Sequence, residues 1–353
     1  MTLNVYNKEF ELIGIIDEYN EIVWTNSYNS LGNVVLDCIG SKNNLELLKM
    51  GNILSKPKTS EAMIITSYEN NYSNDTGLNL KIEGNSLSNI LSYRINTQIL
   101  NYNNRDLKYI VFDIISKNAI ETIDKRRISK LNLLEDSNIY PILDTYQNSY
   151  DSLLDVVISL CNAYEIGFRM DFNYKDKRFD FSLYKGLDLT GSDGLVLFGD
   201  EYDNIKNTEY FESDIQYKNT ALVGGQGDGV DRRLVMIDAE LFDLDRREVF
   251  IDARDITNVK DSEMVMSDEE YIELLNQRGK QRLEEFKIVQ TFNSDIDQNS
   301  KNFIYGKDYN LGDIVLIRNN RGLMKKRICS MTEIYNNQTQ INISFGNDFN
   351  YNL

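Results

Sequence analysis

The sequence predicts an α+β fold that is mostly β, in which two barrel-like, β-rich ends enclose a mixed α/β middle. Short β-forming runs recur at regular spacing in the first and last thirds of the 353 residues, a pattern typical of sandwiches and barrels. The middle third carries two amphipathic helical stripes, and one long capped helix interrupts the last third. We therefore expect domains at residues 1–96, 97–205 and 206–353, with that helix at 267–287.

The first third is predicted to form strands separated by Asn, Gly and charged turns. The runs are "LNVYN", "ELIGIID", "EIVWTNSY", "GNVVLDCIG", "GNILSK", "EAMIITSYE" and "LNLKIEG". The period changes at "NSLSNILSYRI", where Leu87, Ile90 and Leu91 have helical spacing behind Asn85 or Ser86 as the cap.

The middle third is predicted to contain two helices and a hairpin. One apolar stripe lies in "RDLKYIVFDIISKNAI" and the other in "YDSLLDVVISLCNAYEIG", which we expect to end at Gly167. Both stripes are interpreted as core packing. Apolar side chains then alternate on both sides of a "KDKR" turn, which indicates two paired strands: Phe168, Met170, Phe172 and Tyr174, then Phe179, Phe181 and Leu183.

Four glycines crowd the stretch "NTALVGGQGDGVDRRLVMID": Gly224, Gly225, Gly227 and Gly229. A dinucleotide loop needs G-x-G-x-x-G at the start of a helix, and here the third glycine falls one residue early. A Walker loop needs a final Gly-Lys-Ser/Thr, which is absent. The flanking runs "TALVGG" and "RRLVMID" have the composition of strands, so we expect a hairpin whose glycines supply positive φ.

The rest of the last third is predicted to be one helix among strands. Ser267 and Glu270 form a capping box for "SDEEYIELLNQRGKQRLEEFK", and Gly279 is expected to weaken the middle of that helix. "YGKDYNLGDIVLIRNNRGLMKKRICSMTEIY" and "QTQINISFG" are predicted to close the chain as strands, with a turn at "RNNRG".

Composition excludes several classes of function. The chain contains no histidine, which rules out Ser-His and Cys-His nucleophile activation and histidine-based metal sites. Its net charge of −17 opposes stable nucleic-acid binding, which needs a basic surface. Cys38, Cys161 and Cys329 are too few and too scattered for a disulfide framework or a metal motif. The absence of a long apolar run or signal peptide predicts cytoplasmic synthesis without membrane insertion.

Paired carboxylates are the catalytic device that remains. The acids that stand out are Glu212 and Asp214 in "FESD", Asp252 and Asp255 in "DARD", and Asp268, Glu269 and Glu270 in "DEE". We interpret "DEE" as a helix first turn and "DLDRREVFIDARD" as a set of salt bridges across strands or subunits. No calcium loop is complete, since "DFNYKDKRFD" lacks its glycine and "GDGVD" its downstream Glu. We therefore assign no catalytic, cofactor or metal residue.

An ordered set of stretches resembles a known family. They are "VYNKEFELIGIIDEYNEIVWTNSY", "EAMIITSYE", "IEGNSLSNILSYRI", "LLDVVISLCNAYEIGFRM", "YKNTALVGGQGDGVDRR", "RREVFIDARDI", "YIELLNQRGKQRLEEFK" and "YGKDYNLGDIV". Together they resemble the tail-hub proteins of Gram-positive phages and phage-like particles, related to the siphophage Gp37-like family. The fold of that group is similar to the baseplate hub of contractile tails and tail-like bacteriocins.

The resemblance implies a non-enzymatic structural protein. It implies a homotrimer whose six barrel-like hub domains adapt a hexameric tail tube protein to a trimeric spike or tail-tip protein. The glycine hairpin and "RREVFIDARD" would belong to the second barrel. Other baseplate proteins are implied partners, and the tape measure protein is a further candidate. Assembly would occur in the bacterial cytoplasm, and the product would lie in a virion tail or a released particle.

Two alternatives stay open. One is a carboxylate-based cell-wall glycan hydrolase at the tail tip, which needs two acids in a cleft and a raised pKa on one of them. The other is a receptor-binding module for a surface glycan. The sequence shows no fused fibre or hydrolase region, so we expect wall cleavage or receptor binding to fall to other proteins.

Overall fold

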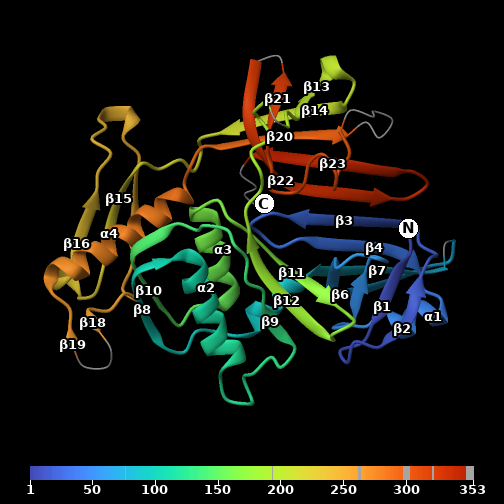
Figure 1. The fold of residues 1–353 in the computed structure, drawn as a ribbon, viewed down its shortest axis with the longest axis horizontal. Coiled ribbons are helices and arrows are strands. Elements are labelled where there is room, and N and C mark those ends of the chain that lie inside the picture. Colours follow the sequence, from blue (N-terminus) through green and yellow to red (C-terminus); the bar gives the residue numbers. More distant parts are fainter. Residues whose placement is uncertain (76, 193, 261–263, 297–302, 320–321, 347–353) are drawn as a thin grey trace.

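The computed structural model describes residues 1–75, 77–192, 194–260, 264–296, 303–319 and 322–346. It is an α+β structure in which strands predominate, as the sequence predicts (Figure 1). Its buried apolar side chains fall into four separate clusters. Two clusters lie along the main sheet, one fills the middle of the chain, and one belongs to a segment inserted late in the sequence.

The two ends of the chain do not form separate barrels. Their strands join into one sheet of thirteen strands, in the order β14-β20-β23-β22-β3-β4-β7-β6-β5-β1-β2, with β21 and β13 continuing from β22. The join is the antiparallel pair β22–β3, which runs from Ser330 opposite Ser27 to Tyr335 opposite Ile22. No closed barrel occurs in the described parts of the chain. The local strand pattern was predicted, but the pairing between the ends depends on contacts across the whole sequence.

The N-terminal strands alternate apolar side chains between two cores. In β6, Met63 and Ile65 face the cluster under the N-terminal half of the sheet, whereas Ala62 and Ile64 face the cluster of the middle segment, because successive side chains point to opposite faces. The bounds are β1 Leu3–Tyr6, β2 Leu12–Ile16, β3 Glu21–Ser27, β4 Asn33–Ile39, α1 Lys42–Leu47, β5 Ile53–Ser55, β6 Ala62–Ser73 and β7 Gly77–Ser86.

The C-terminal strands cover a third core that includes Phe198, Phe292 and Phe345. The hairpin predicted around "RNNRG" forms between β21 and β22, and turn residues 320 and 321 lie outside the described residues. The bounds are β13 Leu197–Gly199, a 3₁₀ turn at Asp200–Tyr202, β14 Ile205–Ser213, β20 Val289–Ile296, β21 Ile314–Asn319, β22 Gly322–Tyr335 and β23 Thr339–Gly346.

The middle segment packs two helices against two small sheets. The elements are the 3₁₀ helix Leu87–Tyr93, β8 Ile99–Asp106, α2 Leu107–Ile115 with a π-helical turn Ser116–Ile120, β9 Leu131–Leu133, β10 Ile142–Ser149, α3 Leu153–Ala163, β11 Gly167–Asn173 and β12 Arg178–Tyr184. Both predicted apolar stripes are buried in its core, and the predicted hairpin is β11–β12.

Helix α3 ends earlier than predicted. Its last residue is Ala163, and the left-handed residue that follows is Glu165, with φ 53°. Gly167 is instead the first residue of β11. A side chain at this position would clash, because a Cβ there would lie 2.3 Å from Cε2 of Tyr28. The glycine therefore allows the Tyr28 ring to approach, and it does not cap the helix.

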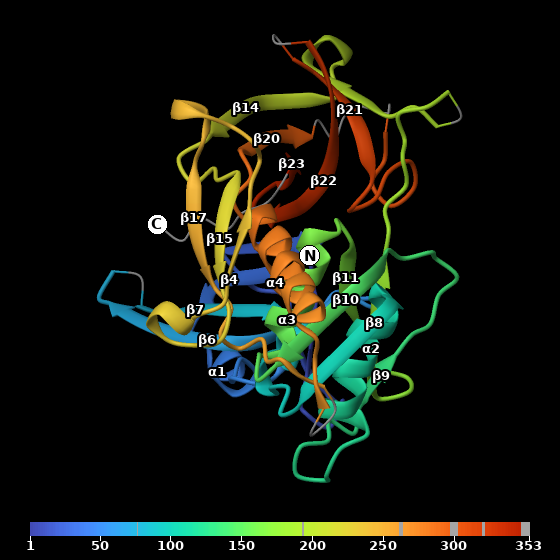
Figure 2. The ribbon, with the colours of Figure 1, turned by 90° about the vertical axis from the view of Figure 1, so that its left-hand side faces the viewer.

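Residues 214–288, which we call the inserted module, leave the main sheet between two paired strands. β14 and β20 are antiparallel, and Ser213 lies opposite Val289, so both ends of the insertion start from one place. The module contains β15 Thr220–Gly224, β16 Leu234–Ile237, β17 Glu248–Asp252, β18 Val259–Lys260, β19 Met264–Val265, α4 Asp268–Glu284 and 3₁₀ turns at Gly229–Asp231 and Asp243–Asp245. Figures 1 and 2 show it beside the middle segment, with α4 next to β10 and α3.

The glycine-rich stretch is the predicted hairpin, β15–β16, and β17 pairs in parallel on the other side of β15. Only Gly227 and Gly229 have positive φ. Gly224 and Gly225 are glycines because neighbouring side chains pack closely against their backbone. A Cβ at Gly225 would lie 2.5 Å from the Tyr271 hydroxyl oxygen. This sheet has its own core and does not pair with the main sheet, so its expected place in a second barrel is wrong.

Helix α4 begins as predicted. Ser267 accepts from the Glu270 amide, and the Glu270 side chain accepts from the Ser267 amide, which completes the capping box. The close packing of α4 explains why position 279 is a glycine, since a Cβ there would lie 2.2 Å from Ile237 Cδ1. The glycine lets the helix pack closely on β16, at the cost of weaker helix propensity.

Candidate functional site

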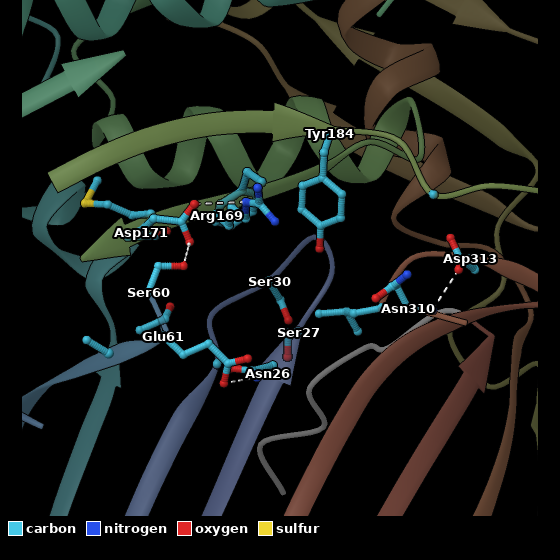
Figure 3. Close-up of a pocket in the computed structure, with 18 of the residues that line it drawn as sticks. Asn26, Ser27, Ser30, Ser60, Glu61, Arg169, Asp171, Tyr184, Asn310 and Asp313 are labelled. Atoms are coloured by element: carbon cyan, nitrogen blue, oxygen red, sulfur yellow. Dashed lines mark hydrogen bonds and ion pairs between the residues drawn. The ribbon is translucent and has the colours of Figure 1, made fainter. Parts of the chain in front are cut away.

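A cavity of about 360 Å³ lies where the N-terminal strands, the β11–β12 hairpin and the C-terminal strands meet (Figure 3). Its wall is mainly polar, with five serines among its residues. The wall comes from six chain segments, which contribute residues within 26–32, 60–63, 86–88, 168–171, 184–187 and 305–313. Because these segments are distant in the sequence, the cavity depends on the tertiary structure.

Asp171 is the carboxylate of this cavity with a raised pKa. It lies on β11, where Ser60 Oγ donates to its Oδ1 at 2.8 Å and Arg169 Nε lies 3.2 Å from its Oδ2. Burial raises the pKa of Asp171 because a desolvated carboxylate is disfavoured. The Arg169 charge and the Ser60 hydrogen bond oppose that rise. This side chain opens the stretch "DFNYKDKRFD", which was weighed only as an incomplete calcium loop, and it was not among the acids singled out as possible catalytic pairs.

Glu61 faces the same cavity and is held by two partners. Asn26 Nδ2 donates to its Oε2 at 2.9 Å, and Lys56 Nζ lies 2.9 Å from the same oxygen. Lys56 is only 6% exposed, and its ammonium also lies 2.6 Å from Glu333 Oε1 on β22. One buried lysine therefore links the wall of the cavity to the C-terminal strands.

Asp313 has a structural position in the wall. Its two carboxylate oxygens accept from the backbone amides of Leu187 and Asn310, both at 2.7 Å. These bonds hold the chain that leaves β12 against the loop before β21. The cavity thus combines two carboxylates, Glu61 and Asp171, that face inward with partners, and a third that fixes the backbone.

The acids singled out in the sequence lie elsewhere; Glu269 lies in the first turn of α4, and the other six are engaged. The list is Glu212 with Gln290, Asp214 with Arg247, Asp252 with Arg232 and Arg254, Asp255 with Arg278, and Asp268 with Arg233, while Glu270 belongs to the capping box. None of them lines the 360 Å³ cavity. The interpretation of "DEE" as a helix first turn is confirmed.

The interpretation of "DLDRREVFIDARD" as a salt-bridge segment is also confirmed, and the pairs lie within one chain. Arg246 contacts Asp238 and Glu248, and Arg254 contacts Asp252. Hydrogen bonding from Arg254 lowers the pKa of Asp252 to about 2, which is opposite to what a general acid needs. Asp252 is therefore an ion-pair partner and not a suitable general acid.

The three cysteines are buried. Burial raises the pKa of Cys38 to about 11 and that of Cys161 further still, so neither thiol has the reactivity of a nucleophile. Within the described ranges, no group of three or more Cys, Asp or Glu side chains could hold a metal ion. No helix of those ranges is long and apolar enough to cross a membrane.

Comparisons of the sequence and of the fold with known proteins both find similarity to phage tail proteins over nearly the whole chain. The model of the family described as Siphovirus ReqiPepy6 Gp37-like protein matches residues 2–347. No curated protein sequence matches significantly.

Three solved structures share the fold. They are a tail protein from Neisseria meningitidis MC58 (TM-score 0.60, 11% identity, covering 98% of this chain and 96% of that one), the prophage MuSo2 43 kDa tail protein from Shewanella oneidensis (0.57, 13%, 98% and 98%) and prophage tail protein gp18 from Listeria monocytogenes EGD-e (0.53, 12%, 99% and 95%).

Proposed function

Because the chain belongs to the Siphovirus ReqiPepy6 Gp37-like protein family, a family of phage tail proteins, we propose that it is a structural hub of a phage tail or tail-like particle. In this role three copies form a ring that adapts a hexameric tail tube to a trimeric spike or tail tip. The observation that carries the proposal is the family match over residues 2–347. The fold shared end to end with three tail proteins supports it.

The chemistry of the chain is consistent with assembly and with passage of DNA. The acids singled out in the sequence are bound to arginines or to Gln290, or lie in the first turn of α4, which is a structural use of charge. The net charge of −17 would repel a polyanion from a central channel and would let DNA pass without being retained. We place the protein in the tail of the particle, next to its tube and tip proteins and other baseplate proteins.

The first test is the mass of the purified chain in solution, by size-exclusion chromatography with light scattering. We expect a closed trimer of three 41.0 kDa chains, about 123 kDa. If the chain alone is a monomer, the run is repeated with the tube protein or the spike protein. A chain that stays monomeric beside both partners would contradict the hub.

The second candidate is the carboxylate-based glycan hydrolase, and the observation that favours it is the 360 Å³ cavity. Asp171 has the raised pKa that a general acid needs, and Glu61 lies in the same wall. Their existing partners argue against it, because both carboxylates are already bound by cations. We infer a non-enzymatic chain.

We therefore expect no release of soluble fragments when the protein is incubated with purified cell walls, with lysozyme as the positive control. Release by the wild type that is lost in both Asp171→Asn and Glu61→Gln would establish the hydrolase instead. The matched control is Asp252→Asn, which removes an acid that has a lowered pKa and does not line the cavity. Equal release by all three variants would indicate a contaminating enzyme.

A further inference from the structure

The inserted module is joined to the middle segment by polar bonds rather than by a shared core. Its apolar cluster, which includes Val223, Leu275 and Ile251, is separate from the cluster that contains Tyr146 and Leu143 of β10. The two parts nevertheless lie in contact through α4, β10 and α3. Domains within a chain that meet through a small polar interface generally move relative to each other.

The bonds across this interface are few and specific. Gln147 Nε2 on β10 donates to the Thr257 carbonyl at 3.0 Å, and the Thr257 amide donates back to Gln147 Oε1 at 2.7 Å. Ser149 Oγ donates to the Asp255 carbonyl at 3.0 Å, and the Thr145 amide donates to Gln277 Oε1 at 3.2 Å. In water these groups find equivalent partners, so each bond favours the docked arrangement only modestly, whereas a group left buried without its partner disfavours it.

The packing beside these bonds is incomplete. Cavities of about 110 and 280 Å³ line the junction, the first between β8, β10 and α4 and the second between β10, the end of α3 and α4. Gln281 on α4 is buried and lines the larger cavity, and its Nε2 has no hydrogen-bond partner among the described residues. An unsatisfied buried amide gains a partner when water reaches it.

The connection to the main sheet has the form of a pivot. Both ends of the module start at the pair Ser213–Val289. Beyond that pair the two connecting segments are tied together, because the Lys218 amide donates to the Phe286 carbonyl at 3.0 Å. Arg247, which directly precedes β17, also binds Asp214 at 2.6 Å. This ion pair ties the connecting segment after β14 to the module. The module and its connectors can therefore turn as one body about the ends of β14 and β20.

We propose that residues 214–288 are a detachable lobe, which releases from β10 and α3 and rotates about the ends of β14 and β20 while both cores stay folded. Release breaks the Gln147–Thr257, Ser149–Asp255 and Thr145–Gln277 bonds and hydrates Gln281. It leaves the clusters of the module and of the middle segment intact. Such a lobe gives the chain a second shape that its partners can select.

Paired spin labels on one chain test the motion. Val230→Cys on the module and Lys125→Cys on the middle segment are exposed sites, whereas the native cysteines are buried and react slowly. We expect a main distance and a second, longer one. Gln147→Ala removes both bonds to Thr257 and should enrich the longer distance roughly tenfold or more. The exposed Gln338→Ala serves as the matched control and should change nothing.

Hydrogen exchange on the unsubstituted chain gives a second readout, which remains valid if Gln147→Ala fails to fold. The Thr257 and Thr145 amides donate across the interface, so they should exchange at least about tenfold faster than amides of β15 and α3. The proposal would be contradicted if the Thr257 and Thr145 amides were as protected from exchange as those of β15 and α3. A single spin-label distance, the same in the wild type and in Gln147→Ala, would also contradict it. When labelled chains are diluted with unlabelled ones, the measured distance lies within a single chain. The lobe can therefore be disproved without disproving the trimer, and the trimer without disproving the lobe.

Discussion

Replacing the buried lysine, Lys56→Ala, should destabilise the main sheet by about 3–5 kcal/mol, because it leaves a buried carboxylate without its cation. Lys56 is 6% exposed and binds Glu61 and Glu333 at 2.9 and 2.6 Å. Its ammonium also lies 5.0 Å from the centre of the Trp24 ring, which is fully buried. The Glu333 side chain is only 13% exposed, so water cannot replace the lost partner there.

Urea unfolding of the main sheet, followed by Trp24 fluorescence, measures this loss. The double variant Lys56→Met with Glu333→Gln removes the more buried pair and should recover part of the loss, since only Glu61, whose side chain is 33% exposed, then lacks its cation. Lys81→Ala is the matched control, because the Lys81–Glu83 pair is nearly half exposed on both sides and exposed pairs contribute little to stability. If Lys56→Ala loses no more than Lys81→Ala, the buried lysine does not join the two ends.

Gly186→Ala should also be strongly destabilising, by about 1–3 kcal/mol or more, because the added methyl group meets backbone atoms. A Cβ at Gly186 would lie 1.9 Å from the Gly312 carbonyl oxygen and 2.6 Å from the Asp313 amide nitrogen. Neither atom can rotate away as a side chain would. The chain after β12 would have to separate from the loop before β21, where Asp313 holds the Leu187 amide.

The matched control is Gly191→Ala in the same connecting segment. No atom lies within 4 Å of a Cβ built there, so the change should stay within about 0.5 kcal/mol of the wild type. Thermal and urea unfolding of both variants give the comparison. Equal stability of Gly186→Ala and Gly191→Ala would mean that the two segments are not packed as closely as the structure has them.

Some strands were not predicted, and their burial explains why. β8 has the sequence "ILNYNNRD" and β10 has "ILDTYQNS", in which apolar residues do not alternate over the whole length. In β10 the buried side chains include Gln147, Asn148 and Ser149, which are satisfied by hydrogen bonds. A buried polar side chain has no signature in hydrophobic periodicity, because only its partner makes burial possible.

The candidate site could not be predicted for a similar reason. Asp171, Glu61 and Asp313 belong to segments that are far apart in the sequence, and the 55 acidic residues gave no reason to choose these three. Most acids chosen from local clusters have partners that are distant in the sequence, such as Arg247 for Asp214 and Arg278 for Asp255. The family resemblance predicted the type of protein, and the match over residues 2–347 confirms it.

Local pattern by itself determined strands β1 to β7 and β21 to β23 of the two ends, the β11–β12 and β15–β16 hairpins, and the capping box of α4. These depend on neighbours two to four residues apart, whose spacing sets which face each side chain occupies. Composition alone excluded histidine chemistry. Only the tertiary structure decided that the two ends form one sheet, that Lys56 binds Glu333 across 277 positions, and that the inserted module has an apolar core of its own. Those choices depend on which distant surfaces bury each other best, and no local window of the sequence contains both partners.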